Sequence, residues 1–143
     1  MSFHRILLTA LTASFAFAHV VVLPESSAIG QEQEYTMHVP NEKKVNNTGV
    51  KLTFPAGVEV LSVAEKPGWK LEVEKNPAGK IVAASWTGSL PSEEVGEFKF
   101  KVRNPAQPGT LAWKAAQTFQ DGSVTQWTGA KGTKTPAPLT VVK

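Results

Sequence analysis

Apolar and polar residues alternate one by one along several short segments, and this pattern limits the possible folds more than any other feature of the sequence. In segment 33–39, Tyr35, Met37 and Val39 are separated by polar residues. Successive side chains of a β-strand point to opposite faces, so each such segment is predicted to be a strand with one buried face. Strands are predicted at 19–23, 33–39, 50–54, 58–63, 69–74, 81–87, 98–103, 111–115, 124–128 and 139–142.

Turn residues separate these segments. Pro55-Ala56-Gly57, Asn76-Pro77-Ala78-Gly79 and Asp121-Gly122 each lie between two alternating runs, and Asp-Gly is a strong hairpin signal. The chain has 11 Gly and 10 Pro in 143 residues, and no stretch has a convincing helical period. The sequence therefore predicts an all-β fold, a single-domain antiparallel β-sandwich whose sheets each expose one face to water.

The first eighteen residues have a different character. His4 and Arg5 precede an apolar run of about ten residues, and the segment ends in Ala16-Phe17-Ala18. A basic start, a short apolar stretch and a small-x-small end are the parts of a secretory signal peptide. We expect residues 1–18 to be cleaved and residues 19–143 to form an exported protein, periplasmic or extracellular. No later segment is long and apolar enough for a membrane anchor, so none is expected in the mature chain.

Composition excludes several functions. The chain has no cysteine, which excludes disulfides, thiolate metal sites and a cysteine nucleophile. Charged residues are 19% of the chain and the net charge is +3, without the basic tract of a nucleic-acid-binding protein. There is no G-x-S-x-G elbow and no phosphate-binding glycine loop. The sequence therefore predicts no catalytic residues, and we expect a protein that is not an enzyme.

His19 is the exception, because the expected cleavage would make it the first residue. An N-terminal histidine offers two nitrogen ligands, its free α-amine and Nδ1 of its ring, which can close on one metal as a chelate. The α-amine titrates near ~8, so a tightly binding metal can displace its proton at neutral pH. Nitrogen ligands in a plane suit Cu(II), which heads the divalent affinity series. The alternative is that His19 is simply the first residue of a strand.

The chain from residue 19 onward resembles a known family, the YcnI-like copper-binding domain, formerly a domain of unknown function. The resemblance covers roughly all of residues 19–143 and rests on eight short motifs in the family's order. These motifs are His19-Val20, Val39-Pro40-Asn41-Glu42, Pro67-Gly68-Trp69-Lys70, Trp86-Thr87-Gly88, Pro108-Gly109-Thr110-Leu111-Ala112-Trp113-Lys114-Ala115, Gln117-Thr118-Phe119-Gln120-Asp121-Gly122, Gln126-Trp127-Thr128-Gly129 and Pro136-Ala137-Pro138.

The resemblance implies an immunoglobulin-like sandwich that holds Cu(II) in a monohistidine brace with a tryptophan beside the metal. Matched by motif, His19 and Glu42 are the expected metal ligands and Trp127 is the tryptophan that shields the metal. Glu25 is closer to His19 in sequence, but an extended strand would carry it roughly 20 Å away at ~3.3 Å per residue. Without the resemblance, Trp127 would be interpreted as a core residue, as would the other three tryptophans, at 69, 86 and 113.

Three functions follow from these observations. The first is an exported copper-binding protein, a chaperone or scavenger in copper homeostasis whose partners are the copper ion and other exported copper-handling proteins. The second is a copper oxygenase of polysaccharide, which would need His38 as a further ligand. The third is a metal-free binding module. Some family members carry a C-terminal membrane anchor or a second copper-binding module, and because neither is recognisable here we expect a free exported protein.

Overall fold

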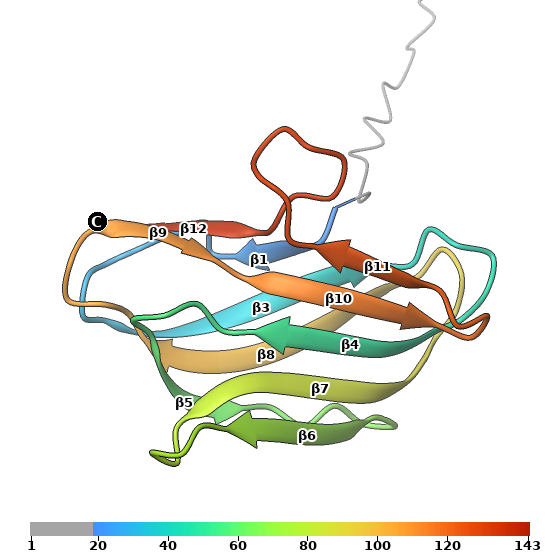
Figure 1. The fold of residues 1–143 in the computed structure, drawn as a ribbon, viewed down its shortest axis with the longest axis horizontal. Coiled ribbons are helices and arrows are strands. Elements are labelled where there is room, and N and C mark those ends of the chain that lie inside the picture. Colours follow the sequence, from blue (N-terminus) through green and yellow to red (C-terminus); the bar gives the residue numbers. More distant parts are fainter. Residues whose placement is uncertain (1–18) are drawn as a thin grey trace, which may run out of the picture.

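The computed structural model describes residues 19–143, so the signal peptide predicted at 1–18 lies outside the described residues. Residues 19–143 form strands and loops without a helix, which confirms the predicted all-β class (Figure 1). In this part of the chain no helix of membrane-spanning length and hydropathy occurs. The strands are β1 (Val21–Leu23), β2 (Ser26–Ser27), β3 (Glu32–Pro40), β4 (Asn47–Thr53), β5 (Glu59–Val63), β6 (Lys70–Lys75), β7 (Ile81–Leu90), β8 (Val95–Arg103), β9 (Gly109–Ala112), β10 (Lys114–Phe119), β11 (Val124–Trp127) and β12 (Leu139–Val142).

Two sheets make the main layers of the sandwich. One has the strand order β1-β3-β8-β5 and the other has the order β11-β10-β4-β7-β6 (Figure 1). Neighbouring strands in both sheets are antiparallel, as predicted. A third, small sheet has the order β2-β12-β9, and in it β2 runs parallel to β12. Two-residue β2 has no alternation to reveal it, and the sequence did not predict it.

The core lies between the two main sheets and follows the predicted alternation. Tyr35, Met37 and Val39 are fully buried on β3, and the phenylalanines of β8 pack against them from the neighbouring strand. The ring centroids of Tyr35 and Trp113 are 4.9 Å apart. Trp86 and Trp113 are buried and Trp69 is partly buried against them, as expected for core tryptophans. Burial of these aromatic rings stabilises the sandwich.

One predicted strand is two strands in the structure. Segment 111–115 was predicted to be continuous, but β9 ends at Ala112 and β10 begins at Lys114, and the two strands belong to different sheets. Trp113 lies at the switch, where its backbone N–H donates to the Pro138 carbonyl and its indole N–H donates to Thr140 Oγ1. These bonds to the β12 side replace the pairing that a continuous strand would have made. The alternation of side chains survives the switch, so it could not reveal the break.

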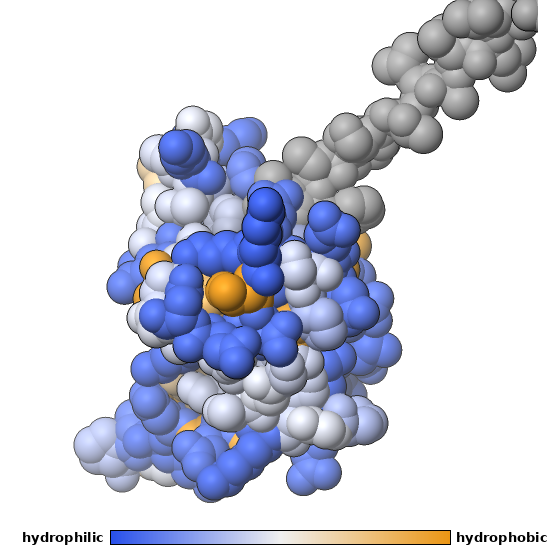
Figure 2. All heavy atoms as spheres, turned by 90° about the vertical axis from the view of Figure 1, so that its right-hand side faces the viewer, coloured by the Kyte–Doolittle hydropathy of each residue, from blue (hydrophilic) through white to orange (hydrophobic). Residues whose placement is uncertain are grey.

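The loops at one end of the sandwich position the candidate site. This end lies on the right in Figure 1 and carries the loop that follows β3 and the tight turn between β10 and β11. Figure 2 looks onto this end and shows mainly hydrophilic residues around a small apolar area. At this end of the sandwich, the loop after β3 contacts the turn after β10, although the two segments are about 80 residues apart. The hydrogen bond from Lys43 Nζ to Ser123 Oγ joins them.

Candidate metal centre

His19 lies two residues before β1 and is exposed, whereas its neighbour Val20 is buried in the core. Val20 packs between the sheets, and β1 then pairs with β3 through Val21 and His38. This anchoring fixes the backbone of residue 19 at the edge of the sandwich while its imidazole remains accessible. An accessible imidazole on a fixed backbone is what a metal ligand at this position requires.

Trp127 lies beside the imidazole. The ring centroids of His19 and Trp127 are 5.7 Å apart and the rings are tilted by 59°. Trp127 is the last residue of β11 and is only 6% exposed. Its ring therefore forms an apolar wall next to His19 and keeps water from that side.

Glu42 completes the group that the sequence predicted. His19, Glu42 and Trp127 line one pocket of about 430 Å³, together with Pro40, Lys43, Gln117, Phe119, Thr125, Lys134 and Thr135. The three predicted residues come from the segment before β1, the loop after β3 and the end of β11. The structure therefore brings together the residues that the sequence singled out, although they lie far apart in the chain.

Asn41 holds the loop that carries Glu42. The Asn41 side chain is 1% exposed, and its Nδ2 donates to the carbonyls of Val45 and Leu90, each at 2.9 Å. Its Oδ1 accepts from the backbone N–H of Lys43 at 3.0 Å. The residues on both sides of Glu42 are therefore fixed by hydrogen bonds, while the Glu42 side chain itself is exposed.

The Glu42 carboxylate is available as a ligand. Within residues 19–143, no lysine, arginine or histidine nitrogen lies within 4.0 Å of it. Lys43, the nearest cation in sequence, contacts Ser123 instead, and its Nζ lies 4.4 Å from the Phe119 ring centroid. Ser123 Oγ in turn donates to Asp121 Oδ1. The hydrogen bonds from Ser123 hold the pKa of the Asp121 carboxyl below its usual 3.8. The lysine ammonium is thus held by other groups.

The donor set fits a metal held by few protein ligands. Among the described residues, no group of three or more histidine, cysteine, aspartate or glutamate side chains is arranged to hold a metal. Side chains at this pocket offer one imidazole and one carboxylate. Both suit Cu(II), whose tetragonal geometry needs further nitrogen or oxygen donors. The α-amine of residue 19 would be such a donor if that residue were the first of the chain.

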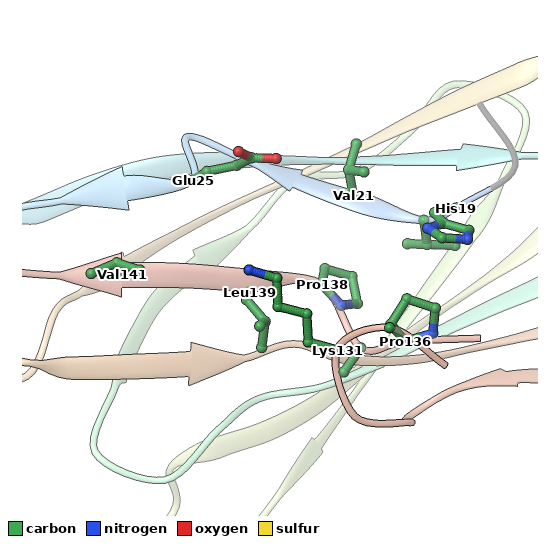
Figure 3. Close-up of a pocket in the computed structure, with 11 residues that line it drawn as sticks. His19, Val21, Glu25, Lys131, Pro136, Pro138, Leu139 and Val141 are labelled. Atoms are coloured by element: carbon green, nitrogen blue, oxygen red, sulfur yellow. The ribbon is translucent and has the colours of Figure 1, made fainter. Parts of the chain in front are cut away.

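A second pocket lies on the other side of His19. It has a volume of about 440 Å³ and runs between β1 and β12, with the loop before β12 lining one end (Figure 3). Its lining is mostly apolar, and Glu25 and Lys131 are the charged residues besides His19. Glu25 lies at the opposite end of this groove from His19 (Figure 3). Glu25 is not part of the pocket that contains Glu42 and Trp127.

His38 lies outside the candidate site. It is on the outer face of β3, opposite to the buried Met37, and its Nδ1 is 3.7 Å from the Glu97 carboxylate on β8. It does not line either of the pockets that contain His19. The sequence left open a role for His38 as a further ligand, and the structure places its side chain with the polar residues of the sheet surface.

A buried polar network behind Trp127 was not predicted. The Trp127 indole N–H donates to Gln117 Oε1 at 2.8 Å, and Gln117 Nε2 donates to the Pro40 carbonyl and to Asn47 Oδ1. Gln117 and Asn47 are 2% and 0% exposed. One signal was present in the sequence: Gln117 occupies an inward position of its strand, two residues from Ala115 and from Phe119. A polar residue at an inward position must find a partner.

The sequence matches a recognised family over nearly its whole described length. Residues 19–142 match the profile of DUF1775, described as a domain of unknown function.

Known proteins and solved structures resemble the chain in sequence and in fold. The copper-binding protein CutI of Bacillus subtilis (strain 168) is 38% identical over 128 residues, which are 87% of this chain and 62% of that protein. The chain thus spans less than two thirds of this relative's length. An uncharacterised protein from Nocardia farcinica with an immunoglobulin-like fold superposes with a TM-score of 0.76 at 25% identity, covering 87% of this chain and 97% of that one. A cohesin from Archaeoglobus fulgidus superposes with a TM-score of 0.55 at 14% identity, covering 87% and 90%, and shares the fold alone. The predicted immunoglobulin-like sandwich is confirmed.

Proposed function

The chain belongs to the DUF1775 family, and we propose that it is an exported copper-binding protein that holds Cu(II) at His19 and Glu42. The membership confirms the resemblance that the sequence motifs indicated. Copper is proposed because the related CutI is a copper-binding protein. Copper binding by this chain also requires ligands of its own, and the pocket at His19 contains side chains that could serve as these ligands.

One observation carries the proposal: His19, Glu42 and Trp127 line the same pocket. The imidazole supplies a nitrogen donor and the carboxylate supplies an oxygen donor that also offsets the charge of the metal. Neither donor is a soft ligand, and within residues 19–143 the one methionine, Met37, is fully buried in the core. Hard and borderline donors of this kind favour Cu(II) over Cu(I).

The proposal includes cleavage after Ala18, because only then does residue 19 have a free α-amine. The amine and Nδ1 of His19 would form one chelate, the monohistidine brace, and Glu42 would occupy another position of the copper plane. Export to the periplasm or the cell exterior follows from the same cleavage. Copper would be the cargo of the protein and not a resident cofactor, since a chaperone or scavenger must bind the ion and later release it.

Storage or delivery is favoured over oxygen activation. A copper oxygenase would need a further imidazole at the metal, and His38 lies on the outer face of β3 beside Glu97. Trp127 covers one side of His19, which limits the approach of other molecules to a bound ion. We therefore propose that the protein is not an enzyme and that it passes copper to other exported proteins.

The test compares two purified forms of the chain. One begins at His19, and its matched control carries one additional alanine before His19. The additional residue converts the amine into an amide, a poor donor, so the first form should bind one Cu(II) much more tightly in a competition titration. Paramagnetic resonance should show nitrogen ligands in the first form. Equal affinity of both forms would exclude the brace.

Two variants identify the ligands further. His19→Ala should lose most of the affinity for Cu(II), whereas His38→Ala should retain it. Intact mass of the protein recovered after export should correspond to residues 19–143, and any other first residue would contradict the proposal. Cleavage of a polysaccharide by the copper-loaded protein with reductant and oxygen, if abolished by His38→Ala, would establish the oxygenase instead.

A further inference from the structure

Gln117 connects two parts of the candidate metal centre that are far apart in the sequence. It lies on β10, faces inward and is 2% exposed. Its Oε1 accepts from the Trp127 indole N–H at 2.8 Å, and its Nε2 donates to the Pro40 carbonyl at 2.9 Å. One side-chain amide therefore links the ring beside His19 to the end of the strand that leads to Glu42.

The orientation of this amide is determined by its partners. An indole N–H can only donate, so it requires the amide oxygen, and a carbonyl can only accept, so it requires the amide nitrogen. Asn47 supports the same orientation, because its Nδ2 donates to the carbonyls of Gly49 and Thr118, and its Oδ1 accepts from Gln117 at 3.0 Å. Within residues 19–143, no buried side-chain nitrogen or oxygen lacks a partner. The network is thus fully connected.

Both linked groups belong to the pocket that contains His19 and Glu42. Trp127 contacts the imidazole of His19, and Pro40 precedes the Asn41 turn that holds Glu42. Pro40, Gln117 and Trp127 all line the pocket themselves. A change at Gln117 would therefore reach both the shielding ring and the loop of the carboxylate ligand, without removing any copper donor.

From these contacts we propose that Gln117 is the positioning residue of the copper site. It sets the Trp127 ring and the Glu42 loop relative to His19, and this determines how a bound Cu(II) is coordinated and how fast it leaves. The inference rests on the proposed function and extends it to a residue that binds no metal. Residues that orient the ligands of a metal typically change its affinity by about 10–100-fold when they are replaced.

The test uses the chain that begins at His19 and compares Gln117→Leu with Gln126→Leu. Gln126 is exposed on the neighbouring strand β11, so its replacement is the same chemical change without the network. We expect Gln117→Leu to alter the paramagnetic spectrum of bound Cu(II) and to raise the rate of copper removal by a chelator by about tenfold or more. Gln126→Leu should behave as the wild type.

A third variant separates positioning from a general loss of stability. Trp86→Phe removes a different buried indole bond, from Trp86 Nε1 to the Ala64 carbonyl, inside the core. It should destabilise the fold but leave the copper spectrum and the removal rate unchanged. If Gln117→Leu affects copper no more than Trp86→Phe does, Gln117 has only a structural role and the inference is wrong.

The outcomes distinguish this inference from the proposed function. If the wild-type chain starting at His19 binds no Cu(II), the proposed function fails and the inference fails with it. If the wild type binds Cu(II) and Gln117→Leu keeps its spectrum and rate, only the inference fails. Should Gln117→Leu not fold, Gln117→Asn takes its place with the same expected result, because its amide is one methylene too short to reach both Trp127 and Pro40.

Discussion

Replacing Trp127 by phenylalanine should separate the stability of the sandwich from the properties of its metal centre. A phenyl ring keeps most of the apolar wall beside His19 but has no N–H group. The hydrogen bond to Gln117 Oε1 at 2.8 Å is lost, and this oxygen is left buried without its donor. The smaller ring also leaves a cavity in a position that is only 6% exposed.

The magnitude follows from these two losses. An unpaired buried acceptor costs about 1–2 kcal/mol, and the cavity left by the smaller ring costs about 1 kcal/mol more. The free energy of unfolding should therefore fall by about 2–3 kcal/mol. For a chain of this size this lowers the melting temperature by roughly 10 °C. The fold should persist, since the ring is at the end of β11 and the central strands are unaffected.

The assay measures the metal-free protein and the copper-loaded protein separately. Thermal unfolding without metal should give the loss of stability for Trp127→Phe and a similar loss for Trp86→Phe, which also loses one buried indole bond. With copper, only Trp127→Phe should change the paramagnetic spectrum or the rate of copper removal. Equal effects of the two variants on copper would refute the reasoning, because the change would then reflect stability alone.

Three further predictions concern single groups. Glu42→Gln should weaken Cu(II) binding by at least about tenfold in a competition titration, because a neutral amide is a poorer donor. Glu93→Gln in the adjacent loop should leave the affinity unchanged. Equal losses of affinity in the two variants would show that Glu42 is not a ligand. Thr140→Val should lower the free energy of unfolding in urea by about 2–3 kcal/mol, because its hydroxyl bonds a buried indole N–H and a carbonyl; a loss below about 0.5 kcal/mol would contradict this. Burial raises the pKa of Tyr35 above its usual 10.0, so the unfolded chain releases this proton first and stability should fall as the pH rises above 10. In Tyr35→Phe this fall should be smaller, and an unchanged pH profile measured by urea unfolding would exclude the contribution.

The alternation of side chains was sufficient to predict most strands and their buried faces. Tyr35, Met37 and Val39 are buried because a strand places every second residue on the same face. Segment 139–142 was predicted with the bounds that β12 has in the structure. The same local rule could not locate the switch at Trp113. There the chain passes from one sheet to another without interrupting the alternation, and the break depends on a carbonyl of residue 138 and a hydroxyl of residue 140.

The sequence also singled out His19, Glu42 and Trp127, but through a resemblance and the chemistry of an N-terminal histidine. Neither periodicity nor spacing relates these residues, since 23 positions separate His19 from Glu42 and a further 85 separate Glu42 from Trp127. Their meeting in one pocket results from the packing of the two main sheets, because β1 and β3 belong to one sheet and β10 and β11 to the other.

Local sequence by itself determined the strands, their faces and the residue types capable of binding a metal, because these depend on neighbouring positions along the chain. Only the tertiary structure decided that Gln117 joins Trp127 to Pro40 and that His38 lies with Glu97 on the outer surface. Hydrogen bonds between side chains need partners within about 3 Å. Which partners come that close is set by how the two sheets pack, and strand alternation contains no information on that packing.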